Sequence, residues 1–177
     1  MRLKSNNAHP GKQAPMLVLP VTLSCCVLIL GLVPVDQAQA TPGAGVVPEP
    51  VTVGNLPEAV RTKLKASGLG GFEDGTDVTQ IAVYKFTVEP GGYFGWHRHG
   101  GPVWIVVDAG MLTIYDSDDP TCTGTNYAPG SAFLDVGDHV HNAWNEGDDD
   151  VVVYGTFMLP TGGLIRVDAA DPGVCPF

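Results

Sequence analysis

The pattern of apolar and polar positions predicts an all-β protein. From Asp77 onward, short runs that are apolar or that alternate apolar with polar residues are separated by glycine, proline and acidic turns. Period-two alternation is typical of a half-buried strand, and a short continuous apolar run is typical of a fully buried one. We expect strands at 79–88, 103–107 (buried, with Trp104 inside it), 111–116, 132–134, 140–145, 151–159 and 165–167. Many short strands with tight turns favour a sandwich or barrel.

The segment before these strands has a different pattern. Residues 41–52 contain prolines and glycines, which interrupt regular structure, so a linker or an arm is predicted there. Residues 55–68 place Leu56, Val60 and Leu64 at four-residue spacing with Gly68 at the end, which predicts a short N-terminal helix capping the barrel. The predicted organisation is therefore 41–76 as linker and capping helix, 77–168 as the barrel and 169–177 as a C-terminal tail.

Residues 1–40 have the features of an export signal. Basic residues at the start precede a nearly all-apolar, uncharged stretch at 16–35, and Ala38-Gln39-Ala40 fits a small-x-small cleavage site. Cleavage would leave no stable membrane span and a secreted or cell-envelope protein beginning at Thr41. A retained anchor is the competing interpretation, because the apolar stretch is close to the minimum spanning length. A lipoprotein using Cys25 or Cys26 ranks lower, since Thr22-Leu23-Ser24 is a poor lipidation sequence.

Composition narrows the choice of partners. Charged residues make up only 16% of the chain, and 23 glycines with 15 prolines suit a turn-rich β-protein. Three of the nine basic residues and one of the nineteen acidic residues lie in 1–40, which leaves six against eighteen and a net charge of −12. Nucleic acid is excluded as an expected partner, because phosphate binding requires basic surface. A small molecule is the expected ligand, and a homodimer is expected because barrels of this kind often pair through edge strands.

Two of the four cysteines, Cys25 and Cys26, would leave with the signal. An isolated even pair outside the cytoplasm usually forms a disulfide, so Cys122 and Cys175 are predicted to tie an inter-strand loop to the C-terminal tail. Free thiols, or Cys122 as a metal ligand, are the alternatives. Neither cysteine has ligand spacing to a histidine.

Four of the five histidines lie in two His-x-His pairs, His97 with His99 and His139 with His141. Side chains at alternate positions of an extended strand point to the same face, so His97 and His99 offer two imidazoles to one side. One such pair supplies half of a metal site. A third imidazole from the second pair would complete a three-histidine site.

The two histidine segments resemble the two motifs of the cupin superfamily, in the form found in small exported single-domain cupins. The positions in register with the motifs are Gly91, His97, His99 and Gly110 in the first, and Gly130, His141 and Asn145 in the second. Val136 and Asp138 replace a proline and a glycine of the second motif, and Val103 stands where the family has a metal-binding glutamate. The resemblance implies a single cupin jelly-roll β-barrel with His97, His99 and His141 facing inward.

The resemblance also implies chemistry. Three neutral imidazoles suit Fe, Mn, Zn, Ni or Cu as a divalent ion, and some cupin dioxygenases use a comparable three-histidine iron site. With Val103 in the glutamate's place, the site keeps the full charge of the metal, which favours anionic or chelating ligands. The usual general base is also missing.

Other residues near the motifs receive secondary assignments. The turn that the cupin pattern places before His141 would move His139 toward the rim, where it is a candidate fourth ligand or acid–base group. Tyr93 is a further candidate catalytic residue, and Phe94 and Tyr154 could line the pocket. Asn145 is expected to fix a turn and Trp96 to pack in the core. The acidic loop after residue 116 is interpreted as solvated, with calcium binding as the alternative.

Three functions follow from these features. The first is an exported metal-dependent oxygenase acting on a small chelating molecule. The second is a non-catalytic cupin module that binds a metal or a small ligand, which the missing glutamate supports. The third, an isomerase or sugar-modifying cupin, ranks last because it needs an acid–base pair, and only His139 and tyrosines offer one.

Overall fold

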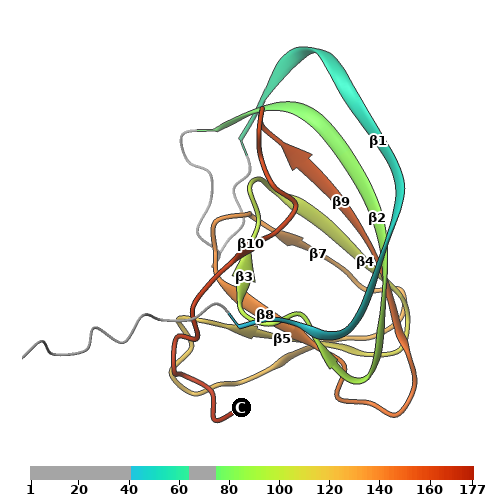
Figure 1. Cartoon of the computed structure of the whole chain (residues 1–177), viewed down its shortest axis with the longest axis vertical. Helices are drawn as coiled ribbons and strands as arrows, with labels where there is room; N and C mark the ends of the chain where they lie inside the picture. Colours follow the sequence, from blue (N-terminus) through green and yellow to red (C-terminus); the bar gives the residue numbers. More distant parts are fainter. Residues whose placement is uncertain (1–40, 64–74) are drawn as a thin grey trace, which may run out of the picture. The chain divides into compact units, whose positions relative to one another are not determined.

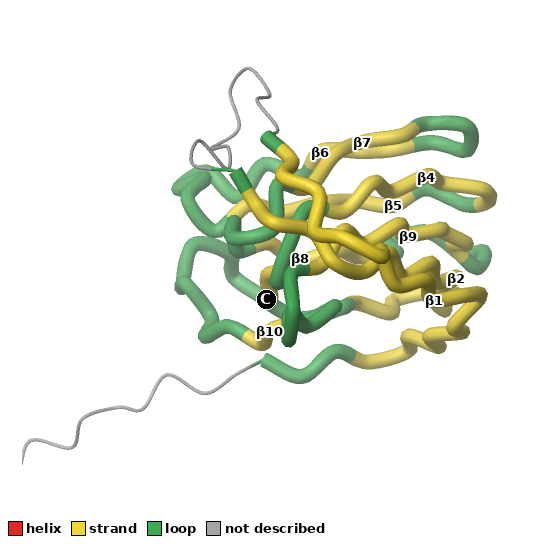
Figure 2. The backbone as a smooth tube through the Cα atoms, turned by 90° about the horizontal axis from the view of Figure 1, so that it is seen from above, coloured by secondary structure: helices red, strands yellow, loops and turns green. Residues whose placement is uncertain are grey.

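The computed structural model describes residues 41–63 and 75–177, and this part of the chain is all-β (Figures 1 and 2). The ten strands are β1 (Ala44–Thr62), β2 (Thr76–Tyr93), β3 (His97–Arg98), β4 (Val103–Ala109), β5 (Leu112–Asp116), β6 (Thr125–Tyr127), β7 (Ala132–Asp135), β8 (His141–Trp144), β9 (Val151–Leu159) and β10 (Val167–Asp168). Within these residues there is no helix long and apolar enough to cross a membrane.

The strands form two antiparallel layers joined at one end. One layer has the order β1-β2-β9-β4-β7, and the other has the order β6-β5-β8-β3-β10. The layers meet where Tyr93 at the end of β2 pairs with Trp144 at the end of β8. Neighbours in this order are far apart in sequence, as in a jelly roll that rolls a sheet into a barrel. The expected cupin-type jelly-roll barrel is confirmed.

The core lies between the two layers and is built by alternation. Along β9, Val151, Val153, Phe157 and Leu159 are buried, whereas Tyr154 faces out. Their buried partners come from both layers and include Val88, Val107, Leu112 and Ala143.

The expectation that 103–107 is buried throughout is wrong. Val103 and Val107 are buried, but Trp104 is 46% exposed and Val106 is also exposed. An apolar run does not reveal on its own that only one face of the strand is covered, because burial depends on the layer packed against it.

The linker predicted at 41–52 is also wrong. From Ala44 the chain forms β1, which pairs with β2 along its length (Figure 1). Prolines are tolerated here because β1 is an edge strand that pairs with β2 alone, so it has one side that needs no donors. The ladder shifts register between Pro50 and Thr52. Non-local pairing, invisible to local pattern, overrides the turn-forming composition.

The N-terminal helix predicted at 55–68 fails where it can be compared. Residues 55–62 continue β1 as strand, with Asn55 opposite Gln80 and Val60 opposite Val78. Residues 64–68 of the predicted helix, and the whole of the predicted signal at 1–40, lie outside the described residues. The four-residue spacing of Leu56 and Val60 therefore did not indicate a helix, because the pairing of β1 with β2 decides the local structure.

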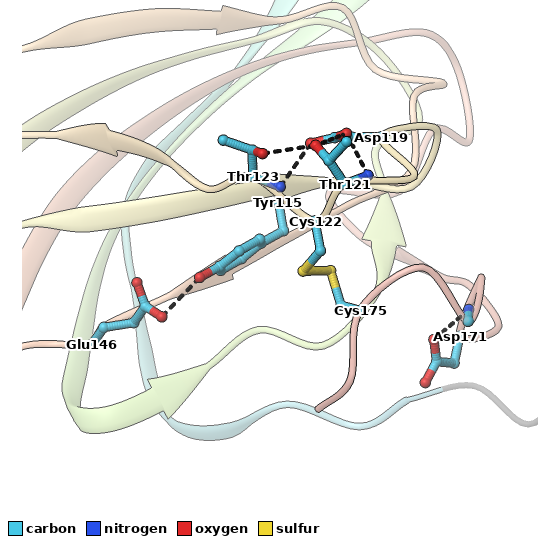
Figure 3. The surroundings of a disulfide bond; sticks show 9 residues. Tyr115, Asp119, Thr121, Cys122, Thr123, Glu146, Asp171 and Cys175 are labelled. Atoms are coloured by element: carbon cyan, nitrogen blue, oxygen red, sulfur yellow. Dashed lines mark hydrogen bonds between the residues drawn. A yellow bond between two sulfur atoms is a disulfide. The ribbon is translucent and has the colours of Figure 1, made fainter.

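The predicted Cys122–Cys175 disulfide is confirmed (Figure 3). It joins the loop after β5 to the C-terminal tail, and Cys175 is buried with Trp96 and Tyr115. Trp96 packs in this cluster, as expected, and its ring stacks on Phe177. In the chain-entropy model a loop of this length stabilises the fold by about 4 kcal/mol.

Candidate metal centre

His97 and His141 are brought together by strand pairing. His97 begins β3, His141 begins β8, and the two residues lie directly opposite one another in the antiparallel ladder. Opposed residues of an antiparallel pair point to the same side of the sheet. His99 lies two residues after His97 and is held by a hydrogen bond from its amide to the Gly137 carbonyl, 2.6 Å long. The three side chains therefore face one interior space.

Gly95 makes the entry to this strand possible. Its φ is +76°, and a Cβ there would collide with the Thr41 carbonyl oxygen. The start of the described chain thus crosses directly over Gly95, and Trp96 donates its amide proton to the Thr41 hydroxyl over 2.7 Å. Any larger residue would push the histidine strand and the crossing segment apart.

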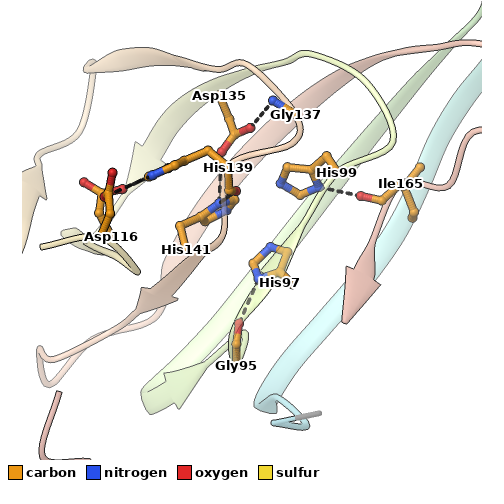
Figure 4. Close-up of polar contacts among 10 residues, drawn as sticks. Gly95, His97, His99, Asp116, Asp135, Gly137, His139, His141 and Ile165 are labelled. Atoms are coloured by element: carbon orange, nitrogen blue, oxygen red, sulfur yellow. Dashed lines mark hydrogen bonds and ion pairs between the residues drawn. The ribbon is translucent and has the colours of Figure 1, made fainter. Parts of the chain in front are cut away.

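The three imidazoles converge (Figure 4). Their ring centroids are 4.4 Å apart for His97 and His141, 4.9 Å for His97 and His99, and 5.2 Å for His99 and His141. One ring nitrogen of each lies within 4.8 Å of the other two, and all three residues are at most 6% exposed. This three-histidine cluster has the composition and spacing to hold a metal ion.

The hydrogen bonds of the three rings define which nitrogen faces the centre. Nδ1 of His97 lies 2.8 Å from the Gly95 carbonyl oxygen, and Nδ1 of His99 lies 2.6 Å from that of Ile165. Nδ1 of His141 lies 3.0 Å from Oδ2 of Asp135. Carbonyl and carboxylate oxygens only accept, so each Nδ1 carries a proton and Nε2 is the nitrogen of each ring that is available to a metal. Nε2 of His99 is buried and has no hydrogen-bond partner among the described residues.

The protonation preferences of the cluster also fit a metal. Burial, and after it the neighbouring imidazoles, lower the pKa of His97 well below its ordinary value and that of His99 to about 4. Burial acts the same way on His141, but the hydrogen bond and charge of Asp135 outweigh it and raise the pKa of His141. The same pairing outweighs burial at Asp135 and lowers the pKa of its carboxyl. Metal-binding histidines are typically neutral, as His97 and His99 are, and are often oriented by a carboxylate behind the ring, as His141 is by Asp135.

Asp135 is the site residue that the sequence reasoning missed. In the β4–β7 ladder it lies directly opposite Val103, the position where the resemblance led us to look for a carboxylate. Val103 itself is fully buried among Ala82, Phe157 and Leu159. The carboxylate is therefore present on the adjacent strand, where it contacts His141. A sequence signal existed: Asp135 shares a strand face with Phe133, so an acidic residue alternates with an inward apolar one.

The two histidines of the second pair, His139 and His141, do not share a face, as the turn expected before His141 predicts. His139 points away from the other three histidines, with Nε2 3.1 Å from Oδ1 of Asp118 and Nδ1 3.5 Å from Oδ1 of Asp116 (Figure 4). Its side chain is 28% exposed. The structure thus places His139 outside the cluster, in the acidic loop region. The interactions of Asp116 and Asp118 with His139 give those two carboxylates a structural partner.

The remaining candidates are placed as follows. The Tyr93 ring packs against Trp144 with centroids 5.0 Å apart, and Tyr154 is exposed on the outer face of β9. Phe94 lies beside His97, with ring centroids 5.7 Å apart. Asn145 is fully buried, and its amide donates to the carbonyls of Val88 and Asp149, so it fixes the turn after β8.

A cavity of about 330 Å³ opens from the three histidines into the barrel. Its wall is mostly apolar, with aromatic rings from several strands, and Arg166 is its cationic residue within the described chain. The apolar lining comprises Phe86, Phe94, Ile105, Leu112, Ile114, Phe133, Val153 and Phe157, and the start of β1 closes one side. A cavity of this size suits a small molecule.

Comparisons with known proteins add fold-level similarity. The sequence matches no protein-family model and no curated protein. Among solved structures, the chain is similar to a cupin domain from Bordetella pertussis Tohama I, with 17% identity over 69% of this chain and 99% of that chain and a TM-score of 0.44. It is also similar to the cupin_2 domain of an XRE-family transcriptional regulator from Enterobacter cloacae, with 17% identity, 66% and 98% coverage and a TM-score of 0.42. A cupin-like protein from Thermotoga maritima MSB8 matches with 21% identity, 51% and 65% coverage and a TM-score of 0.46.

The strand order gives this chain a jelly-roll barrel of the cupin type, and the three-histidine cluster lies inside it. Within that class, this chain has a histidine cluster with Asp135 behind it and Val103 in the glutamate position.

Proposed function

We propose that this chain binds one divalent transition metal through Nε2 of His97, His99 and His141. The observation that carries the proposal is the hydrogen bonding of the three rings: each Nδ1 donates outward, so the lone pairs of Nε2 are directed to one buried point. The unpartnered Nε2 of His99 supports it, because a buried acceptor without a partner costs stability unless something occupies its lone pair. Fe, Mn, Zn, Ni and Cu all accept such a donor set.

Under this proposal the protein is a metal-dependent oxygenase acting on a small chelating molecule. The metal would supply a Lewis acid and, for a redox-active ion, an electron source for reaction with dioxygen. The chain's own residues do the rest. Asp135 fixes the tautomer and orientation of His141, and the aromatic wall excludes water and holds the apolar part of a ligand.

A non-catalytic module that binds a metal or a small ligand is the second candidate. One observation favours it: the ionisable residues lining the cavity, in the described part of the chain, are the three histidines and Arg166. With the histidines committed to a metal and an arginine that stays charged, the wall offers no general base.

We also propose that residues 1–40 direct export and are removed, and that the mature chain pairs into a homodimer. The Cys122–Cys175 disulfide supports an oxidising compartment, because such bonds are rare in the cytoplasm. The acidic excess supports a ligand that is neither nucleic acid nor a membrane surface. N-terminal sequencing of the protein from its native cell envelope or medium, expected to begin at Thr41, tests the cleavage.

Metal analysis and a substrate panel test the main proposal. Protein purified without a histidine tag is expected to carry, or to take up, about one equivalent of a transition metal. Less than about half an equivalent, not restored by added metal, would contradict metal binding. Oxygen consumption by the loaded protein with small diols, diketones and thiols separates the two candidates. Turnover supports the oxygenase, and silence together with a ligand that raises the melting temperature supports the module.

A further inference from the structure

Arg166 is a partly exposed cation at the edge of the three-histidine cluster. It lines the cavity, between Ile165, whose carbonyl holds His99, and Val167, which begins β10. Its Nε donates to Oδ1 of Asp168 over 2.6 Å, which fixes the plane of the guanidinium. Nη2 is buried and has no hydrogen-bond partner within 41–63 and 75–177.

The Arg166 side chain is 30% exposed and pairs with Asp168, but its Nη2 stays buried and unpaired among the described residues, so it can still accept an anion as a partner. A divalent ion bound by the three histidines would, together with Arg166, bring three positive charges against the carboxylates of Asp135 and Asp168. The net excess of one positive charge, next to a buried unpaired N–H, calls for a singly negative ligand.

We propose that Arg166 binds the carboxylate of the cavity's ligand, which is a small monocarboxylate with an apolar, aromatic-sized body. An arginine held by a carboxylate at Nε still presents N–H groups in a fork that matches carboxylate oxygens. The apolar remainder of the wall, including Phe94, Phe133 and Phe157, receives the body of the ligand. The inference rests on the proposed function for the metal's place beside the carboxylate, but the contact with Arg166 requires no metal.

The test uses a matched pair of probes on the untagged full-length chain. The first probe is 3-phenyllactate, and the second is its neutral amide, which has the same shape without the charge. Calorimetric titration is carried out on metal-free protein and again on zinc-loaded protein, so that binding is measured without turnover. The wild type is expected to prefer the acid in both states, with a larger preference when zinc is bound.

The variant series isolates the guanidinium. Arg166→Gln is expected to weaken phenyllactate binding about 10- to 100-fold, the range for losing a charge-assisted hydrogen bond, and to change amide binding less than about threefold. Arg166→Lys is expected to fall between, because lysine keeps the charge and loses the fork. Arg98→Gln is the matched control: it removes the same charge from an exposed side chain of β3 and is expected to leave both affinities within about twofold of wild type.

The binding results decide whether Arg166 holds the carboxylate of the ligand. Binding of phenyllactate that is absent, that equals amide binding, or that survives Arg166→Gln unchanged would overturn the assignment. If Arg166→Gln does not fold, Arg166→Lys is read in its place, and an unchanged affinity there overturns it equally. An Arg166-dependent preference in a protein that takes up no metal upholds this inference while the metal proposal fails. Metal uptake without that preference upholds the metal proposal and overturns this inference.

Discussion

The two His-x-His pairs have the same local sequence pattern, but both histidines of the first pair face the interior and only one of the second pair does. His97 and His99 both face the interior, with a 4.9 Å separation of their rings. His139 and His141 are divided by the start of β8: His141 faces the interior, and His139 lies among the carboxylates of the acidic loop. The difference teaches that alternate spacing places two side chains on one face only where the backbone stays extended between them.

The surroundings of the two pairs differ in the same way. The inward histidines meet almost no solvent, and this burial lowers the pKa of His97 and His99 although the oxygen acceptors at Nδ1 act to raise it. His139 instead contacts Asp116 and Asp118 at the surface, where ion pairs contribute little. The same residue type is a candidate metal ligand in one environment and a solvated partner of carboxylates in the other.

The largest expected effect comes from comparing the two members of the second pair directly. His141→Ala removes one of three converging nitrogens and should lower metal affinity by more than about 100-fold, beyond the loss typical of an outer-shell partner. His139→Ala should leave affinity within about twofold. Competition titration against a chelating dye measures both. Equal losses in the two variants would show that the second pair acts as a unit.

The same comparison can be made for the carboxylate partners of the two histidines, Asp135 for His141 and Asp118 for His139. Asp135→Asn keeps the shape but loses the charge that orients His141, and metal affinity should fall about 10- to 100-fold. Asp118→Asn, which removes the corresponding partner of His139, should change affinity by less than about twofold. The same dye competition reports both. If the two asparagine variants behaved alike, Asp135 would have no role behind the metal.

These contrasts also mark what the sequence could predict. Strand alternation predicted a sandwich or barrel, and the resemblance to the two cupin motifs predicted the jelly-roll barrel and the convergence of His97, His99 and His141. They missed Asp135 and Arg166, because the contact of Asp135 with the cluster depends on the β4–β7 register and the place of Arg166 depends on the return of the C-terminal segment to β3. They also failed for β1 and Trp104, whose state depends on the layer beside them. Local pattern carries little information about such non-local neighbours.

The third prediction concerns the stability of the metal-free protein. The pKa of His99 is lowered to about 4 from an ordinary 6.5. Between these two pH values the His99 side chain is protonated in the unfolded chain and neutral in the folded chain. Stability from this group is fully present above pH 6.5 and falls as the pH drops toward 4, by about 3 kcal/mol at most. His97, with its lowered pKa, adds to the same trend.

Urea unfolding between pH 4 and pH 6.5 measures that trend. His99→Gln should flatten the dependence on pH, whereas His139→Gln should keep the wild-type slope. His141 and its partner Asp135 act outside this window. His141, with a raised pKa, loses stabilising effect only as the pH rises above 6.5, and Asp135, with a lowered pKa, loses it only below 3.8. A wild-type slope of zero would contradict a neutral, buried His99.

The most direct measurement is a crystal structure of the untagged protein with anomalous scattering at the absorption edge of the metal it carries. We predict one ion about 2.0–2.2 Å from Nε2 of His97, His99 and His141, with His139 still beside Asp116 and Asp118. An ion bound instead by His139 and its carboxylates, or a loaded crystal with no ion at the three rings, would contradict the account.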